Sequence, residues 1–409
     1  AAGAAVTTGI RNTLIGALAG DALTDADDNV AIGQQSLSSD TLGSGAVAIG
    51  HNALFTQNFT TATTNYNVAI GYKAGEAVTT GVENTIVGGL AGDALTTGYQ
   101  NVAMGYQSLS ADTKGVATVA IGVSALKNQN HTTITSTYNT AVGYVAGRDT
   151  ATGTNNTFIG ALAAYDGANG NHNTIVGYAA GQNNAASFNT LMGSLTGDSL
   201  TSGASNTALG YASLTTDTNG SFSTAVGNQA LATQNFTTAT DAHNTGIGNL
   251  AGSLVTTGIQ NTLVGSLAGD ALTDADMNVA VGYAALSVDT KGSESTAIGR
   301  GALANQNFTT STDSHNTAVG HSAGQQMTTG IQNVLLGSNA GLNLTDADQN
   351  VAIGHAALTS DTLGSKSIAI GREALVTQNF TTATDVYNVA IGHNAGQAVT
   401  TGTRNTIVG

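Results

Sequence analysis

The five residues Asn29-Val30-Ala31-Ile32-Gly33 decide how this chain folds, because their pattern recurs along its whole length. The pattern is Asn, then Thr or Val, then any residue, then Ile, Val, Leu or Met, then Gly, and 409 residues hold 23 copies of it. Successive glycines of the pattern are usually 17 residues apart, with five intervals of 21 and one of 16. Such a fixed period is typical of repeat proteins in which each unit stacks on the next.

The intervals are themselves ordered. Three of 17 residues and one of 21 make a 72-residue super-repeat with four distinguishable coils. The second coil carries Leu-x-x-Asp-Thr-x-Gly, as at 37–43, and the third is the 21-residue coil, usually with Gln-Asn-Phe-Thr-Thr. The distance from Gly143 to Gly248 is 105 residues, so two extra coils are inserted near 156–188. Apart from this insertion, the pattern predicts one continuous repeat region over residues 1–409.

The coils are predicted to be built from strands. A 17-residue period is too short for pairs of helices, and 54 glycines disfavour helix. Alternation within the core places Val30 and Ile32 on one face of a strand and Ala31 and Gly33 on the other. A second short run, such as 35–37, is expected to complete each coil. The prediction is an all-β fold, a parallel β-roll or β-solenoid of 17- and 21-residue coils, assembled as a multi-chain fibre.

Asparagine opens 18 of the 23 cores, and the exceptions all open a 21-residue coil: Ala46, Thr118, Ser223, Ser295 and Ser367. Two interpretations stay open. Stacked coils can align these side chains into a hydrogen-bonded ladder. Alternatively, Asn is present because it tolerates a left-handed turn between coils.

Composition excludes several classes of function. Charged residues make up 9% of the chain and the net charge is −15, which disfavours binding to nucleic acid or to anionic lipid. No apolar run approaches the length needed to span a bilayer, so no membrane insertion is expected. Absence of cysteine removes disulfides and thiolate chemistry and fits an extracellular protein. The chain opens on Ala1 and stops on a core motif, so we expect it to be part of a longer protein, and any leader to have been removed or to lie outside it.

The cores at 29–33, 46–50 and 67–71 resemble the Ser/Asn-Val-Ala-Ile-Gly repeats in the heads of YadA-like trimeric autotransporter adhesins. Similar Asn-Thr-Ala-Ile-Gly arrays occur in phage tail-fibre-like proteins and in large surface proteins of gliding bacteria. The resemblance covers nearly the whole chain and implies a parallel β-roll wound within each chain, with chains associated around a common axis. The coil is longer than the usual head repeat, and the 72-residue super-repeat departs from that pattern. We therefore expect a cyclic homo-oligomer but set its number of chains at three or more, not at three.

The 21-residue coils contain the candidate binding or inter-chain contact residues. A large apolar ring recurs there, with one histidine in its place: Phe59, Phe236, Phe308, Phe380 and His131. A repeated aromatic in a polar bulge suits a glycan or receptor contact, whereas burial of the ring at a chain contact suits a structural role. We expect these rings to be buried at a chain contact and the threonines after them to face solvent.

A weaker candidate is a cation site at the three Thr-Asp-Ala-Asp segments, because oxygen-seeking ions use Asp-x-Asp spacing. Its residues are Asp25, Asp27, Asp274, Asp276, Asp346 and Asp348, with Ca²⁺ as the ion. The alternative is a solvated turn, because Ca²⁺ needs six to eight oxygens and the matching turn at 96–100 has no acid.

Catalysis is not predicted, because the sequence offers no obvious pair of carboxylates and no nucleophile arrangement. We expect a structural and adhesive fibre shaft that positions a binding surface for a cell-surface or glycan target. It would be a cell-surface or released filament, or a virion tail fibre. The alternatives are an ice-binding Thr-rich β-solenoid and, less favoured, a polysaccharide-cleaving tail spike. Against ice binding, the Thr-Thr pairs at Thr79, Thr256, Thr328 and Thr400 recur only once per super-repeat.

Overall fold

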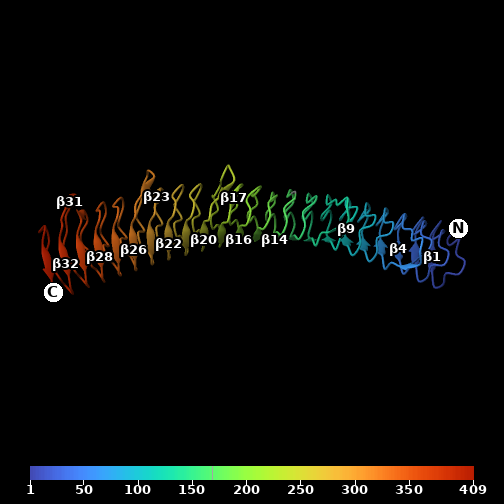
Figure 1. Ribbon diagram of the computed structural model, residues 1–409, viewed down its shortest axis with the longest axis horizontal. Coiled ribbons are helices and arrows are strands. Elements are labelled where there is room, and N and C mark those ends of the chain that lie inside the picture. The colour runs from blue at the N-terminus through green and yellow to red at the C-terminus, as the bar shows by residue number, and fades with distance from the viewer. Residues whose placement is uncertain (168) are drawn as a thin grey trace. The chain divides into compact units, whose positions relative to one another are not determined.

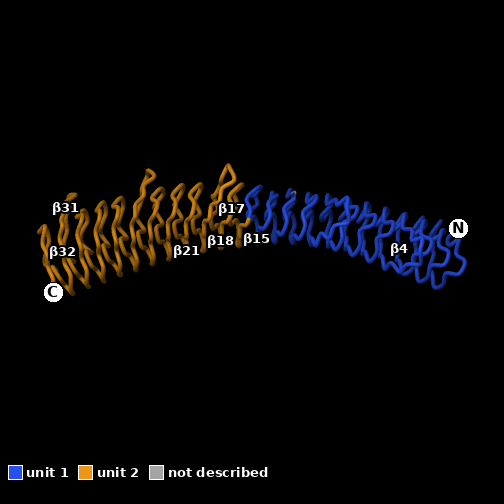
Figure 2. Tube along the Cα trace, viewed as in Figure 1, with its two compact units in different colours: residues 1–204 blue, residues 205–409 orange. Residues whose placement is uncertain are grey.

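The computed structural model describes residues 1–167 and 169–409, which form two compact units, residues 1–204 and 205–409 (Figure 2). Every described element is a strand. Within each unit the chain winds as a parallel β-solenoid, and each coil contributes one three-residue strand from the repeated core (Figure 1). The all-β, parallel solenoid prediction is therefore confirmed.

The core strands coincide with the sequence repeat, one per copy. In the first unit they are β1 Thr13–Ile15, β2 Val30–Ile32, β4 Val47–Ile49, β6 Val68–Ile70, β7 Thr85–Val87, β8 Val102–Met104, β10 Val119–Ile121, β12 Thr140–Val142, β13 Thr157–Ile159, β14 Thr174–Val176 and β15 Thr190–Met192. In the second unit they are β16 Thr207–Leu209, β18 Thr224–Val226, β20 Thr245–Ile247, β21 Thr262–Val264, β22 Val279–Val281, β24 Thr296–Ile298, β26 Thr317–Val319, β27 Val334–Leu336, β28 Val351–Ile353, β30 Ile368–Ile370, β32 Val389–Ile391 and β33 Thr406–Val408.

Successive core strands pair in parallel and place equivalent residues beside one another. Between β2 and β4 the partners are Val30 with Val47, Ala31 with Ala48 and Ile32 with Ile49. The hydrogen bonds that join them run between consecutive coils of the same chain, so within each unit the coils stack directly. Sheet formation therefore requires no strand from a second chain.

The predicted alternation within the core is confirmed, and the middle residue of each core strand faces inward, which is Ala in most coils and Ile, Leu or Phe in others. Ala31 and Ala48 are fully buried, whereas Val30 and Ile32 on either side of Ala31 stay partly exposed. Leucines from the turn that follows, such as Leu37, fill the rest of the interior. A 17-residue coil encloses little space, and an Ala face lets its two walls approach closely.

The backbone conformation and the proximity of the next coil both require glycine at the last position of each core. Gly33 has φ +132°, which L-residues with a side chain rarely adopt. A Cβ placed there would lie 2.6 Å from the carbonyl oxygen of Gly50, its equivalent in the next coil. The glycines therefore stack on one another, and any side chain would separate the coils.

The run at 35–37 is a turn and not a second strand. Gln35 and Leu37 have φ of 58° and 53°, in the left-handed region. Changing the sign of φ reverses the direction of successive N–H groups, so Gln35 donates to Ala17 of the preceding coil and Leu37 to Ala53 of the following one. The turn thus bonds both neighbouring coils, which compensates for an unfavourable conformation.

The four extra residues of each long coil build a second, two-residue strand. Thr63 and Thr64 pair in parallel with Gly43 and Ser44 of the coil before. The same pairing recurs in all five long coils. The pairs are β3 Gly43–Ser44 with β5 Thr63–Thr64, β9 Gly115–Val116 with β11 Thr135–Ser136, β17 Gly220–Ser221 with β19 Thr240–Asp241, β23 Gly292–Ser293 with β25 Thr312–Asp313, and β29 Gly364–Ser365 with β31 Thr384–Asp385.

Candidate functional site

The buried asparagines form the ladder that was one of the two interpretations of the sequence. Asn29 accepts the Ala46 N–H at Oδ1 (2.9 Å) and donates its own N–H to Oδ1 of Asn12 (2.9 Å). Its Nδ2 donates to the carbonyl of Gly43 (3.0 Å). The left-handed residue is Asp28, one position earlier, with φ 60°. The turn interpretation is therefore wrong for Asn, which is retained for its side-chain hydrogen bonds.

A buried network replaces the ladder where a long coil opens without Asn. Gln57 donates to Oδ2 of Asp40 (2.7 Å) and accepts from Nδ2 of Asn67 (2.8 Å). Asp40 also accepts the N–H groups of Gly43 (3.1 Å) and Phe59 (3.0 Å) at Oδ1. Burial raises the pKa of Asp40, and these hydrogen bonds to its carboxylate oppose that rise.

The same three residue types recur in the other four long coils. The triplets are Asp112–Gln129–Asn139, Asp217–Gln234–Asn244, Asp289–Gln306–Asn316 and Asp361–Gln378–Asn388. Sequence reasoning treated this aspartate only as part of a coil motif. The signal that identifies its role is the constant distance of 17 residues from Asp to Gln, which equals one coil.

The recurrent aromatic rings lie beside this network and are buried by their own chain. The exposed fractions are 6% for Phe59, 5% for Phe236, 6% for Phe308 and 7% for Phe380. Phe59 packs closely against Gly43, because a Cβ added to Gly43 would lie 2.8 Å from Phe59 Cδ2. The two threonines that follow Phe59 are exposed. The rings are thus buried as expected, but residues of their own chain already cover them. Their contact with another chain stays a prediction.

His131 takes the place of the ring in the second long coil and lies beside a buried carboxylate. Its Nδ1 lies 3.8 Å from Oδ2 of Asp112, and the exposed fractions are 6% and 0%. The neighbouring carboxylate raises the pKa of His131, and burial opposes the rise. Burial alone would raise the pKa of Asp112, but His131 and the amide of Gln129 outweigh it and lower the pKa.

Five of the six aspartates considered as metal ligands accept hydrogen bonds from the preceding coil. Asp27 accepts the Ile10 N–H (2.8 Å), and Asp25 accepts the Thr8 hydroxyl (2.6 Å). In the second unit Asp276, Asp346 and Asp348 accept equivalent hydrogen bonds, and Asp274 accepts from Thr273 and Lys291. Among residues 1–167 and 169–409, no three His, Asp or Glu side chains gather as a metal site would require.

One pair of carboxylates does come together, contrary to the expectation from sequence. Arg148 Nη2 lies 2.5 Å from Asp149 and 3.2 Å from Asp166, which stands on the next coil. The guanidinium lowers the pKa of Asp149, whereas partial burial and the neighbouring Asp149 raise that of Asp166. The Tyr165 ring lies 3.7 Å from the guanidinium carbon. The arrangement is a surface ion-pair cluster that joins two coils.

The third position of the core strands forms an apolar row on the outward face, whereas the first position is Val, Ile or Thr. Its most exposed large side chains at the third strand position include Ile70 (37%), Met104 (39%), Leu209 (47%) and Leu336 (45%). Nine of the eleven tyrosines are also exposed, with fractions from 46% to 64%. Isolated exposed apolar residues are normal on soluble proteins, but a continuous row of them marks an interaction surface.

No helix in the described part of the chain is long and apolar enough to cross a membrane. In comparisons with known proteins, the chain matches no family model and no curated protein sequence.

Proposed function

We propose that this chain is the shaft of an extracellular structural and adhesive fibre in which identical chains associate around a common axis. The observation that carries the proposal is the apolar outward face of the core strands, which continues from coil to coil within each unit. The interior of each coil is already filled by Ala and Leu. The outward apolar residues are therefore not needed for the chain's own core.

Covering this face is energetically worthwhile. Fully burying a large aliphatic side chain stabilises a protein by about 1.5–3 kcal/mol. Covering one that is near 40% exposed would therefore contribute about 0.6–1.2 kcal/mol more. Five such side chains of the second unit are 38–47% exposed, which together amounts to roughly 3–6 kcal/mol before the entropic cost of association: Leu209, Ile247, Ile298, Leu336 and Ile391. A second copy fits this surface, because both partners then present rows of apolar side chains with the same spacing.

The adhesive part of the proposal is supported by the exposed tyrosines. Tyr66, Tyr138 and Tyr144 are 60% or more exposed, and each has a polar hydroxyl beyond an apolar ring. Such side chains are enriched where proteins contact other molecules, including carbohydrates. A cell-surface or glycan target fits this surface, and the role is mechanical and adhesive rather than catalytic.

The test is the assembly state of the full chain. Sedimentation and electron microscopy should show an oligomer of three or more chains in elongated particles. Replacing Ile32, Ile49 and Ile70 together with Thr keeps strand propensity while removing apolar area, and should dissociate the assembly. Replacing Thr60 and Thr61 with Ser should not. A folded, monodisperse monomer of the unmodified chain would overturn the proposal.

A second candidate, ice binding, gains support from a column of threonines on the same outward face. Thr140, Thr157, Thr174 and Thr190 occupy equivalent positions on four successive paired strands of the first unit. They differ from the Thr-Thr pairs that occur once per super-repeat, because here every coil contributes one. Thermal hysteresis of a monomeric chain would favour this function, whereas an oligomer without thermal hysteresis favours the fibre.

A further inference from the structure

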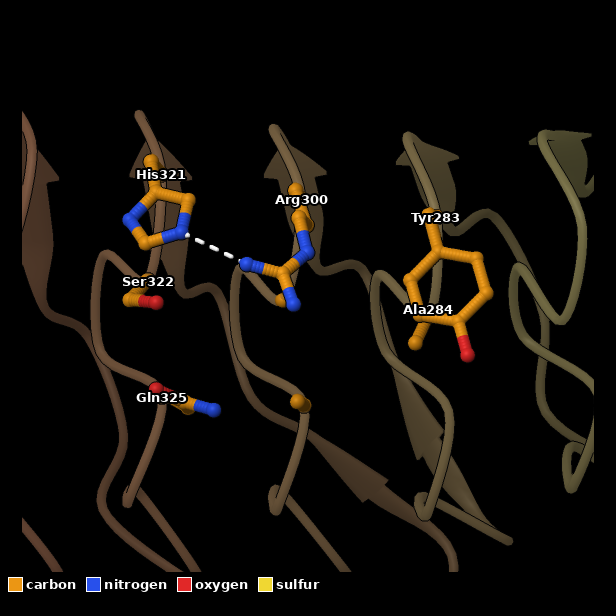
Figure 3. A pocket seen from close by; sticks show the side chains of 8 residues that line it. Tyr283, Ala284, Arg300, His321, Ser322 and Gln325 are labelled. Atoms are coloured by element: carbon orange, nitrogen blue, oxygen red, sulfur yellow. Dashed lines mark hydrogen bonds between the residues drawn. The ribbon is translucent and has the colours of Figure 1, made fainter.

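A shallow hollow crosses three successive coils of the second unit, those of β22, β24 and β26 (Figure 3). Its volume is about 310 Å³. Tyr283, Arg300 and His321 each directly follow the closing glycine of their core, and all three are exposed along its edge. Ser322 and Gln325 contribute polar groups to its floor.

The hollow exists because three small residues succeed one another where other coils carry longer ones. Ala284, Gly301 and Ser322 occupy the second position after the closing glycine. At Gly301 an added Cβ would meet nothing closer than Gln325 Nε2 at 3.7 Å and Ser322 Oγ at 3.9 Å. Elsewhere this position holds residues such as Gln35 and Lys73, whose side chains would occupy the space.

Two polar groups of the hollow can contact a ligand. Ser322 is 7% exposed, and no hydrogen bond joins its hydroxyl to a described residue. The hydroxyl is open to solvent on the side of the hollow, so a ligand can reach it. Arg300 donates to His321 Nε2 (3.1 Å) but has no carboxylate partner among the described residues. No acidic side chain lines the hollow.

Among the described residues, Arg300 is one of four basic side chains that form no ion pair, together with Lys114, Lys127 and Arg404. The other six form ion pairs with carboxylates: Arg11, Lys73, Arg148, Lys291, Lys366 and Arg372. A guanidinium presents a planar fork of donors that matches a carboxylate at two points. An unpaired guanidinium beside an acid-free hollow therefore selects an anionic group.

We propose that this hollow binds the carboxylate of an acidic saccharide. Arg300 pairs with the carboxylate, the ring of Tyr283 packs against the apolar face of the sugar, and Ser322 and Gln325 hydrogen-bond its hydroxyls. The inference adds a ligand class to the proposed adhesive role. It rests on the proposed function for its biological meaning, whereas binding to the hollow can be tested without it. The hollow lies within one chain and needs no second copy.

Calorimetric titration of the full chain with tri-galacturonic acid tests the site. Its fully methyl-esterified form is the matched neutral probe, and galactose 6-sulfate tests whether any anion suffices. We expect the acid to bind and the ester to bind at least about tenfold more weakly, since a charge-assisted contact contributes about 1.5–3 kcal/mol. Equal binding of the ester, tighter binding of the sulfate, or no binding of the acid would overturn the proposal.

Two variants copy residues that the chain already uses at equivalent positions, so the coil should fold. Arg300→Ser matches Ser266 and should weaken binding about tenfold or more. Gly301→Gln matches Gln107, which has φ 55° against 65° for Gly301, and should fill the hollow and abolish binding. Circular dichroism should be unchanged. Unaltered binding in both variants refutes the site, and sedimentation of the same samples shows separately whether the fibre proposal holds.

Discussion

Removing one rung of the asparagine ladder should destabilise the solenoid far more than removing an exposed polar residue of the same coil. Asn84 is fully buried and accepts the N–H of Asn101 at Oδ1 (3.1 Å). Its Nδ2 donates to the carbonyl of Gly98 (3.0 Å) and to Oδ1 of Asn67 (3.3 Å). Asn84→Ala therefore leaves the Asn101 N–H and the Gly98 carbonyl without these partners.

The magnitude follows from those two orphaned groups. Each buried, unsatisfied polar group costs about 1–3 kcal/mol, so Asn84→Ala should lower the free energy of unfolding by about 2–6 kcal/mol. Because each coil contacts only its neighbours, the loss should be concentrated in the coils on either side. Amide exchange should accelerate there and remain slow in distant coils.

The matched control is Gln100→Ala in the same turn region. Gln100 is exposed and donates one hydrogen bond to Glu83 (3.0 Å), and Ala117 already occupies the equivalent position with the same φ of 58°. Its cost should be below about 0.5 kcal/mol. Denaturant unfolding and hydrogen exchange measure both variants. A loss below about 1 kcal/mol for Asn84→Ala, with unchanged exchange, would falsify the ladder as a source of stability.

Three further substitutions test other features. Gln57→Met leaves a buried carboxylate oxygen of Asp40 without a partner and removes one of the two hydrogen bonds that the Asn67 amide donates. It should cost about 2–5 kcal/mol in denaturant unfolding, whereas exposed Gln34→Met should cost little. Gly33→Ala puts a Cβ 2.6 Å from a carbonyl oxygen and should lower the melting temperature, whereas Gly89→Ala, with 3.6 Å to its nearest neighbour, should not. Because the pKa of His131 is raised, its stabilisation is full below about pH 6.5 and is lost as pH rises through the folded value. His131→Phe should therefore remove part of the decline in melting temperature as pH rises above about 6.5, and an unchanged decline would contradict this.

The sequence identified the coils because their spacing and the alternation at 29–33 directly reflect the stacking. It did not identify the turn geometry. The left-handed positions carry residues such as Leu37, Tyr66 and Gln100, whereas glycine and asparagine are the usual signals for that conformation. Hydrogen bonds between coils impose the conformation, and they are visible only once the stack is formed.

The candidate sites, like the fold, could be predicted from the sequence only in part. The recurrence of Phe59 and its equivalents predicted burial, but the network that surrounds the ring depends on Asp40 and Gln57 from different coils. The pair Asp149 and Asp166 was missed because its members are close only after one full coil. The hollow beside Arg300 was missed because it results from three small residues that are 17 and 21 residues apart.

The stacked closing glycines have a consequence for how such a chain changes in length. Each coil offers its neighbours the same backbone edge, so a genetic duplication or deletion of whole coils joins edges that already match. In the insertion near 156–188, Thr157 pairs with Thr174 in the ordinary register. The number of coils within a unit can therefore change by recombination between similar DNA segments. Changes of one or four residues outside the core strands are also accommodated, since the 16-residue coil and the 21-residue coils keep the strand register.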